Sequence, residues 1–225
     1  MTGFDIAGMI RAFSVGLLPV LFAITLHEVA HGWAARAFGD RTAEMLGRLS
    51  LNPLKHVDPV GTVVVPIAVY VLSSGSFLFG WAKPVPIGTR NLHHPKRDMV
   101  WVALAGPASN LLMGVGWALV YQLAAMGAFG QSALAVFLAG MGKIGVFFNA
   151  LLAVFNLIPL PPLDGGRVLR GLVPESIGKG LDAVEPFGLI IIVVLLSVGV
   201  IWPVVGPAIQ ITQALMYSLA GAGGA

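Results

Sequence analysis

Long apolar runs separated by short polar segments are the main pattern of this sequence. Long stretches lack Asp, Glu, Lys and Arg altogether, among them residues 12–26, 60–82, 99–142 and 186–225. A helix needs roughly 20 mostly apolar residues to cross the hydrocarbon core of a bilayer. The pattern therefore predicts an all-α polytopic membrane protein.

The breaks between these runs predict where individual helices lie. The first apolar segment covers residues 6–38 and stops at Gly39 and Asp40, a typical helix end. Pro203 and Pro207 are expected to divide the last region into a span and a final helix. We expect about five transmembrane helices, with four to six compatible with the pattern, over residues 6–38, 60–79, 99 onward, 133–157 and 187 onward.

The polar connectors are short. Residues 40–58 form a polar segment, and residues 165–185 look polar and turn-rich. Residues 81–87 carry Pro84 and Pro86 in alternate positions, which favours an extended edge strand or loop that an unwound substrate backbone could join. Connectors of about 20 residues cannot bury a core of their own. We therefore expect residues 1–225 to form a single membrane-embedded domain with short extended or re-entrant segments.

The basic residues leave the orientation open. One group precedes the apolar run 60–79 (Arg41, Arg48 and Lys55), and another follows it (Lys83, Arg90, Lys96 and Arg97). If the run crosses the membrane, the two groups face opposite sides and contradict the excess of positive charge expected in cytoplasmic loops. If the run re-enters, both groups can be cytoplasmic.

Composition supports a lipid-embedded chain and excludes other classes. The 225 residues are 57% hydrophobic and 10% charged, whereas soluble domains carry about 25% charged residues. The net charge of +3 is spread over short connectors rather than one basic face, which argues against nucleic-acid binding. The absence of cysteine excludes disulfides and thiolate metal sites. The N-terminus lacks the features of a cleaved signal peptide, so the first span is expected to remain.

His27, Glu28 and His31 form an HExxH pattern inside the first apolar segment. Residues four apart share one face of a helix, so both imidazoles can bind one metal ion. Glu28 can reach a water molecule in the open position of that metal and take its proton. Ionisable residues at bilayer depth cost about 2.5–3.5 kcal/mol each on insertion scales. A chance match is therefore a poor explanation.

A zinc site of this kind needs a third protein ligand. His56, His93 and His94 are candidates, but they lie in polar, turn-rich segments where solvated histidines are common. Asp164 follows an uncharged run that ends in three prolines, so it emerges beside a helix break within the membrane. It could ligate the metal, cap the helix that begins after it, or do both.

The combination of motifs resembles the site-2 protease family of intramembrane metalloproteases. That family carries HExxH on one span and NxxPxPxLDG on a later one, and here residues 156–165 read Asn-Leu-Ile-Pro-Leu-Pro-Pro-Leu-Asp-Gly. Residues 105–110, Ala-Gly-Pro-Ala-Ser-Asn, resemble a further family element. The resemblance covers about residues 17–171.

The resemblance implies one Zn²⁺ ion per chain with His27, His31 and Asp164 as ligands and Glu28 as general base. It implies that Asn156 holds the substrate backbone or the developing oxyanion, and that Asn110 supports the site. The expected activity is hydrolysis of peptide bonds within or near transmembrane segments of protein substrates, as in regulated intramembrane proteolysis. The expected place is a prokaryotic cell membrane, with the active site toward the cytoplasm. No PDZ or nucleotide-binding domain is expected.

Intramembrane His and Asp residues are also used by metal-ion transporters and channels. A transport pathway would place polar residues on several spans, yet residues 99–142 contain few. The glutamate of HExxH also has no evident role in transport. We therefore expect a protease and keep a transporter or channel as the alternative. A scaffold without activity fits poorly with a complete set of ligands and base.

Overall fold

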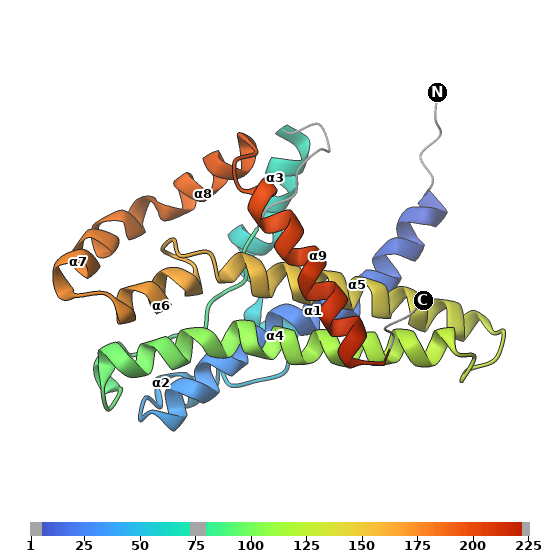
Figure 1. The fold of residues 1–225 in the computed structure, drawn as a ribbon, viewed down its shortest axis with the longest axis horizontal. Helices are drawn as coiled ribbons and strands as arrows, with labels where there is room; N and C mark the ends of the chain where they lie inside the picture. The colour runs from blue at the N-terminus through green and yellow to red at the C-terminus, as the bar shows by residue number, and fades with distance from the viewer. Residues whose placement is uncertain (1–5, 73–79, 222–225) are drawn as a thin grey trace.

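Two long antiparallel helices form the centre of the structure, a computed structural model that describes residues 6–72 and 80–221. They are α4 (Pro95–Ala125) and α5 (Ala133–Asn156), which lie side by side (Figure 1). Their close approach depends on glycine. A Cβ atom on Gly142 would lie 2.7 Å from Tyr121 Cβ, and one on Gly145 would lie 2.2 Å from the Trp117 ring. Small residues at such contacts let helix backbones pack tightly in lipid.

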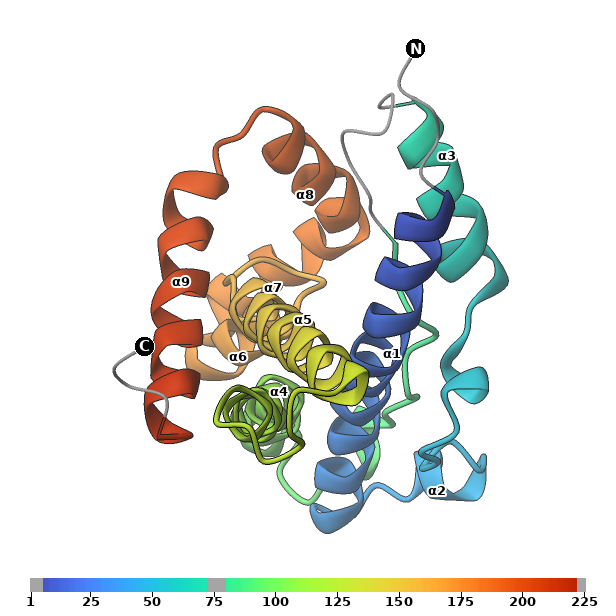
Figure 2. The ribbon, with the colours of Figure 1, turned by 90° about the vertical axis from the view of Figure 1, so that its right-hand side faces the viewer.

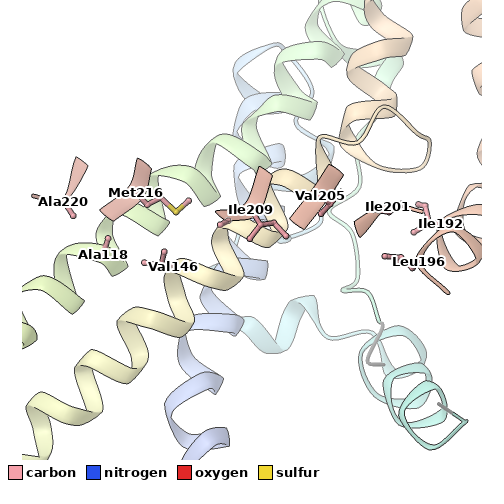
Figure 3. Packing of buried hydrophobic residues seen from close by; sticks show 10 residues of the cluster. Ala118, Val146, Ile192, Leu196, Ile201, Val205, Ile209, Met216 and Ala220 are labelled. Atoms are coloured by element: carbon pink, nitrogen blue, oxygen red, sulfur yellow. The ribbon is translucent and has the colours of Figure 1, made fainter. Parts of the chain in front are cut away.

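Helices α1 (Ile6–Ala37) and α9 (Trp202–Leu219) flank this pair on different sides, as the end-on view in Figure 2 shows. Helix α9 packs over α4 and α5, and Met216 fits against Gly114, where a Cβ atom would lie 2.4 Å from its sulfur. This contact belongs to the main apolar cluster (Figure 3), made of Ala118, Val146, Ala150, Ile192, Leu196, Ile201, Val205, Ile209, Met216 and Ala220.

Four helical segments of the described residues are long and apolar enough to cross a membrane. They cover Phe13–Ala37, Pro95–Ala125, Ala133–Asn156 and Glu175–Ser197. All regular elements in the described part of the chain are helical. The all-α polytopic prediction is therefore confirmed, with the number of candidate spans at the lower end of the expected range.

The run at residues 60–79 does not form a long helix over its described part. It begins as a π-helix (η2, Pro59–Val64) and continues as α3 (Val65–Leu72), and residues 73–79 lie outside the described residues. The two ends of the run meet, because the Trp81 N–H donates to Gly61 O at 3.0 Å and the Thr62 hydroxyl donates to Trp81 O at 2.9 Å. The Lys83 N–H likewise donates to His56 O at 2.9 Å. The run therefore returns to the side from which it left.

The segment expected to be turn-rich is helical instead. It contains α6 (Asp164–Leu172) and α7 (Glu175–Val184), and a 3₁₀ turn (η4, Glu185–Phe187) joins α7 to α8 (Gly188–Ser197). The polar residues there satisfy one another, since Arg170 pairs with Glu175 and Asp182, each at 2.8 Å.

The division of the last apolar region also differs from the prediction. The chain turns at Gly199, whose φ of +81° suits glycine. Pro203 lies in the first turn of α9, where a missing N–H costs nothing. Pro207 lies inside α9 and does not end it. Shorter elements are α2 (Thr42–Met45), η1 (Pro53–His56) and η3 (Thr89–Asn91), all between α1 and α4.

The meeting of residues 61 and 81 predicts that positions 55 and 83 face the same side of the membrane. The chain has no cysteine, so Lys55→Cys, Lys83→Cys and Gln131→Cys each provide a single thiol at an exposed position. In sealed vesicles, a membrane-impermeant maleimide should label positions 55 and 83 from one side. It should label position 131, between α4 and α5, from the other. Labelling of 55 and 83 from opposite sides would contradict the hairpin.

Candidate metal centre

Three side chains from two helices converge at one point inside the bundle. His27 Nε2 and His31 Nε2, both on α1, lie 3.1 Å apart. Asp164 Oδ2, at the start of α6, lies 3.2 Å from the first of these atoms and 3.3 Å from the second. The three residues are 5–7% exposed. Among the described residues they form the one cluster with the composition and spacing of a metal site.

The hydrogen bonds behind the imidazoles determine which nitrogen carries each proton. His31 Nδ1 lies 2.7 Å from the Val102 carbonyl oxygen, which can only accept. His27 Nδ1 lies 2.6 Å from Asn110 Oδ1, also an acceptor. Both rings therefore hold their proton on Nδ1 and direct the lone pair of Nε2 toward Asp164. Among the described residues, Asp164 Oδ2 meets no hydrogen-bond donor.

This arrangement fits a zinc ion. Three electron-rich atoms at 3.1–3.3 Å repel one another unless a cation lies between them. Zinc bonds of 2.0–2.1 Å in a tetrahedral site separate neighbouring ligand atoms by about 3.3–3.4 Å. Two imidazoles and one carboxylate are also a usual ligand set for zinc with an open fourth position. Ring nitrogens held from behind by oxygen atoms are typical of metal-ligating histidines.

Gly106 of α4 lies against both imidazoles. A Cβ atom there would lie 2.4 Å from His31 Nε2 and 2.7 Å from His27 Cε1. Any side chain at this position would displace the rings. The glycine in the element at residues 105–110 is therefore required by the close approach of α4 to the site, a requirement that the sequence alone does not show.

Asp164 is positioned by a tightly folded loop between α5 and α6. A Cβ atom on Gly165 would lie 2.3 Å from Leu157 O, and one on Gly166 would lie 2.4 Å from Pro161 N. The two glycines let the start of α6 pack directly on the proline-rich loop. The N-cap of α6 is Leu163, and no side chain caps it. Asp164 is thus the first residue of α6, and its carboxylate faces the two histidines instead of capping the helix.

Glu28 lies beside the cluster and is held by the extended segment that crosses it. Its Oε2 accepts a hydrogen bond from the Val85 N–H at 2.7 Å. The segment around Val85 is extended without strand pairing, as the loop alternative predicted. Its N–H groups at Lys83 and Val85 bind His56 O and Glu28, and Pro84 and Pro86 have none.

Asp40 holds this segment in place at the end of α1. Its carboxylate accepts from the Gly88 N–H at 2.6 Å, from the Thr42 N–H at 3.0 Å and from Asn91 Nδ2 at 3.0 Å. Burial by itself would raise the pKa of Asp40, but the hydrogen bonds from Thr42, Asn91 and Gly88 outweigh it and lower the pKa below its ordinary value. Asp40 therefore stays charged and fixes the distance between α1 and the segment over Glu28.

Among the described residues, no hydrogen bond joins the remaining candidates to the cluster. Asn156 Nδ2 donates to Leu152 O at 2.9 Å in its own helix, and no hydrogen bond between described residues joins it to the cluster. His56 Nε2 contacts Ser50 O at 2.8 Å. His93 and His94, in the connector before α4, are absent from the metal-site cluster found among the described residues.

Comparison with known proteins places this chain among zinc proteases. It is 39% identical over 195 residues to "Putative zinc metalloprotease YwhC" of Bacillus subtilis (strain 168), which covers 83% of this chain and 84% of the relative. The chain belongs to the site-2 protease family of zinc metalloproteases, peptidase family M50. The family model for M50 matches residues 124–199.

Two more distant relatives of this site-2 protease are also named as zinc metalloproteases. It is 34% identical over 176 residues to Rip2 of Mycolicibacterium smegmatis, which covers 78% of the chain and 64% of that relative. It is 22% identical over 166 residues to the zinc metalloprotease MJ0392 of Methanocaldococcus jannaschii, 36% of whose length is covered. No solved structure matches the chain. The protein is thus a zinc metalloprotease whose apolar helices fit a lipid bilayer, and the transporter alternative loses its support.

The contact of Gly106 with both imidazoles predicts that Gly106→Ala loses zinc and protease activity, because the methyl group takes the space of the rings. Gly116→Ala on the same helix is the matched control, since a Cβ atom there has no neighbour within 4 Å. Zinc content by atomic absorption should fall from about one ion per chain to near zero for the first variant only. Full zinc content in Gly106→Ala would mean that α4 lies farther from the site.

Proposed function

We propose that this site-2 protease is an intramembrane endopeptidase that hydrolyses peptide bonds within or near transmembrane segments of membrane-protein substrates. His27, His31 and Asp164 hold the zinc ion, and Glu28 is the general base. Such cleavage releases one part of the substrate from the membrane, as in regulated intramembrane proteolysis. One observation carries the proposal: three unprotonated ligand atoms converge 3.1–3.3 Å apart inside an apolar helix bundle, with a carboxylate beside them.

The chemistry follows from the placement of Glu28. A bound zinc ion would lower the pKa of a water molecule to about 7. Glu28 would take a proton from the attacking water molecule and would pass it to the leaving amine when the C–N bond breaks. The Val85 N–H holds the carboxylate toward the site. Asn156, at the end of α5, is the proposed contact for the substrate backbone or the developing oxyanion.

We propose that water and substrate reach the site from the polar end of the bundle. A cavity of about 620 Å³ lies between the segment around Val85, the start of α4, and helices α6 and α7. Val85 lines this cavity, and its N–H donates to Glu28, which supports access from this end. His31 and His27 precede the end of α1 by six to ten residues, or about 9–15 Å along the helix. The reacting atoms thus lie within the span but near one end.

The distribution of charge supports a cytoplasmic position for this end. Of the 13 Lys and Arg residues, all but Arg11 and Lys143 lie near the end of α1, in the connector from α1 to α4, at the start of α4, or on α6 and α7. The connector between α4 and α5 has none. Positive residues accumulate in cytoplasmic loops. We therefore propose a multi-pass protein of a prokaryotic cell membrane whose active site opens toward the cytoplasm.

Replacement of Glu28 by Gln should abolish proteolysis but leave zinc bound, because the amide cannot accept a proton and the three ligands are unchanged. The test incubates purified protein with a transmembrane peptide, with and without chelator, and measures cleavage and zinc content. Wild-type cleavage should stop with chelator and return with Zn²⁺. Cleavage at the wild-type rate by Glu28→Gln would remove Glu28 from the mechanism, and His31→Ala should lose both zinc and activity.

The bond from Val85 to Glu28 predicts that Val85→Pro slows cleavage, because proline lacks the N–H that orients the carboxylate. Hydrogen bonds to charged groups contribute about 1.5–3 kcal/mol, which corresponds to roughly 10–100-fold in kcat. Val85→Ala keeps the N–H and serves as the control for the lost side chain. Equal rates for the two variants would show that the hydrogen bond has no part in catalysis.

A further inference from the structure

A chain of buried side-chain amides connects α5 to the metal centre through α4. Asn149 Oδ1 on α5 accepts a hydrogen bond from Asn110 Nδ2 on α4 at 2.9 Å. Asn110 Oδ1 in turn lies 2.6 Å from His27 Nδ1 on α1. Both asparagines are completely buried. Asn149 makes no contact with the three ligand atoms, so the proposed mechanism gives it no role.

Backbone carbonyl groups determine how each amide points. Asn149 Nδ2 donates to Gly145 O at 2.8 Å, so its oxygen faces Asn110. Asn110 Nδ2 donates to Ala23 O at 3.0 Å as well as to Asn149 Oδ1. Because a carbonyl oxygen can only accept, the nitrogen of each amide must face that carbonyl. The oxygen of Asn110 is thereby directed at His27.

The orientation of Asn110 decides which nitrogen of His27 is protonated. With Asn110 Oδ1 facing it, His27 Nδ1 carries the proton and Nε2 has a free lone pair. If the amide of Asn110 turned over, its N–H would face Nδ1 and the proton of His27 would move to Nε2. That nitrogen could then not bind a metal ion. Two acceptors, Ala23 O and Asn149 Oδ1, oppose this rotation.

We propose that Asn149 is a positioning residue for zinc binding: its oxygen holds the amide of Asn110 in the one orientation that presents His27 Nε2 to the metal. The inference rests on the proposed role of His27 as a zinc ligand. It also accounts for a polar side chain in the middle of an apolar span, where each such group needs an internal partner.

The test compares the zinc affinity of wild-type protein with that of Asn149→Leu, by competition between the purified protein and a chelator of known affinity for Zn²⁺. Loss of an outer-shell partner commonly weakens metal binding 10–100-fold, and we expect about tenfold here. In metal-free protein with ¹⁵N-labelled histidine, NMR should show His27 protonated on Nδ1 in the wild type. The variant should show a mixture of the two tautomers.

Two comparisons separate this role from simple packing. Thr212→Val on α9 removes a side-chain hydrogen bond to the carbonyl four residues earlier, as Asn149→Leu also does, but lies outside the amide chain. It should leave zinc affinity unchanged. In an Asn110→Asp background both oxygens accept, so His27 meets an acceptor in either orientation. There Asn149→Leu should weaken zinc binding by less than about twofold.

Unchanged zinc affinity and an unchanged His27 tautomer in Asn149→Leu would overturn the inference, as would an equal loss of affinity in both backgrounds. Asn149→Ser, which keeps a polar group too short to reach Asn110, serves the same test if the leucine variant does not fold. His27→Ala is measured in parallel. If it binds zinc like the wild type, the ligand assignment itself fails. If it alone loses zinc, only the role of Asn149 fails.

Discussion

The mutual repulsion of His27 Nε2, His31 Nε2 and Asp164 Oδ2 is the constraint on which the rest of the structure depends. These atoms carry lone pairs or negative charge, lie 3.1–3.3 Å apart, and are shielded from water. In an apolar interior such groups are costly unless a cation and fixed hydrogen bonds compensate them. The surrounding helices supply the hydrogen bonds, and a zinc ion held by these residues would supply the charge.

Helix α4 supplies most of the groups that hold the two imidazoles. Its Val102 carbonyl and Asn110 side chain hold the two imidazoles from behind, and Gly106 lets its backbone approach them. Pro107 follows the glycine inside the same helix. A helix of this kind costs stability in isolation, because glycine and proline are poor helix formers. In a bilayer the close packing against α1 and α5 offsets that cost.

The polar end of the bundle carries the extended segment that contacts Glu28. After η1, Gly61 and Trp81 are joined by a backbone hydrogen bond, so the chain is on the same side before and after the run. The extended segment that follows contacts Glu28 through the Val85 N–H. Asp40 fixes this segment through Gly88. The same side holds the cavity and most of the basic residues, so the proposed route for water and the proposed cytoplasmic face are at one end of the bundle.

The sequence by itself determined the membrane class, the HExxH motif and Asp164 as the candidate third ligand, since these depend on local spacing and on the cost of polar groups in apolar runs. It also predicted most of the long helices, because an apolar run of about 20 residues is a local feature of the sequence. Only the tertiary structure decided that Gly61 and Thr62 meet Trp81 and that Asp164 faces the histidines. The roles of Gly106, Val85 and Asn149 also became visible only there. Each depends on contacts between residues far apart in the chain, and local patterns carry no information about such contacts.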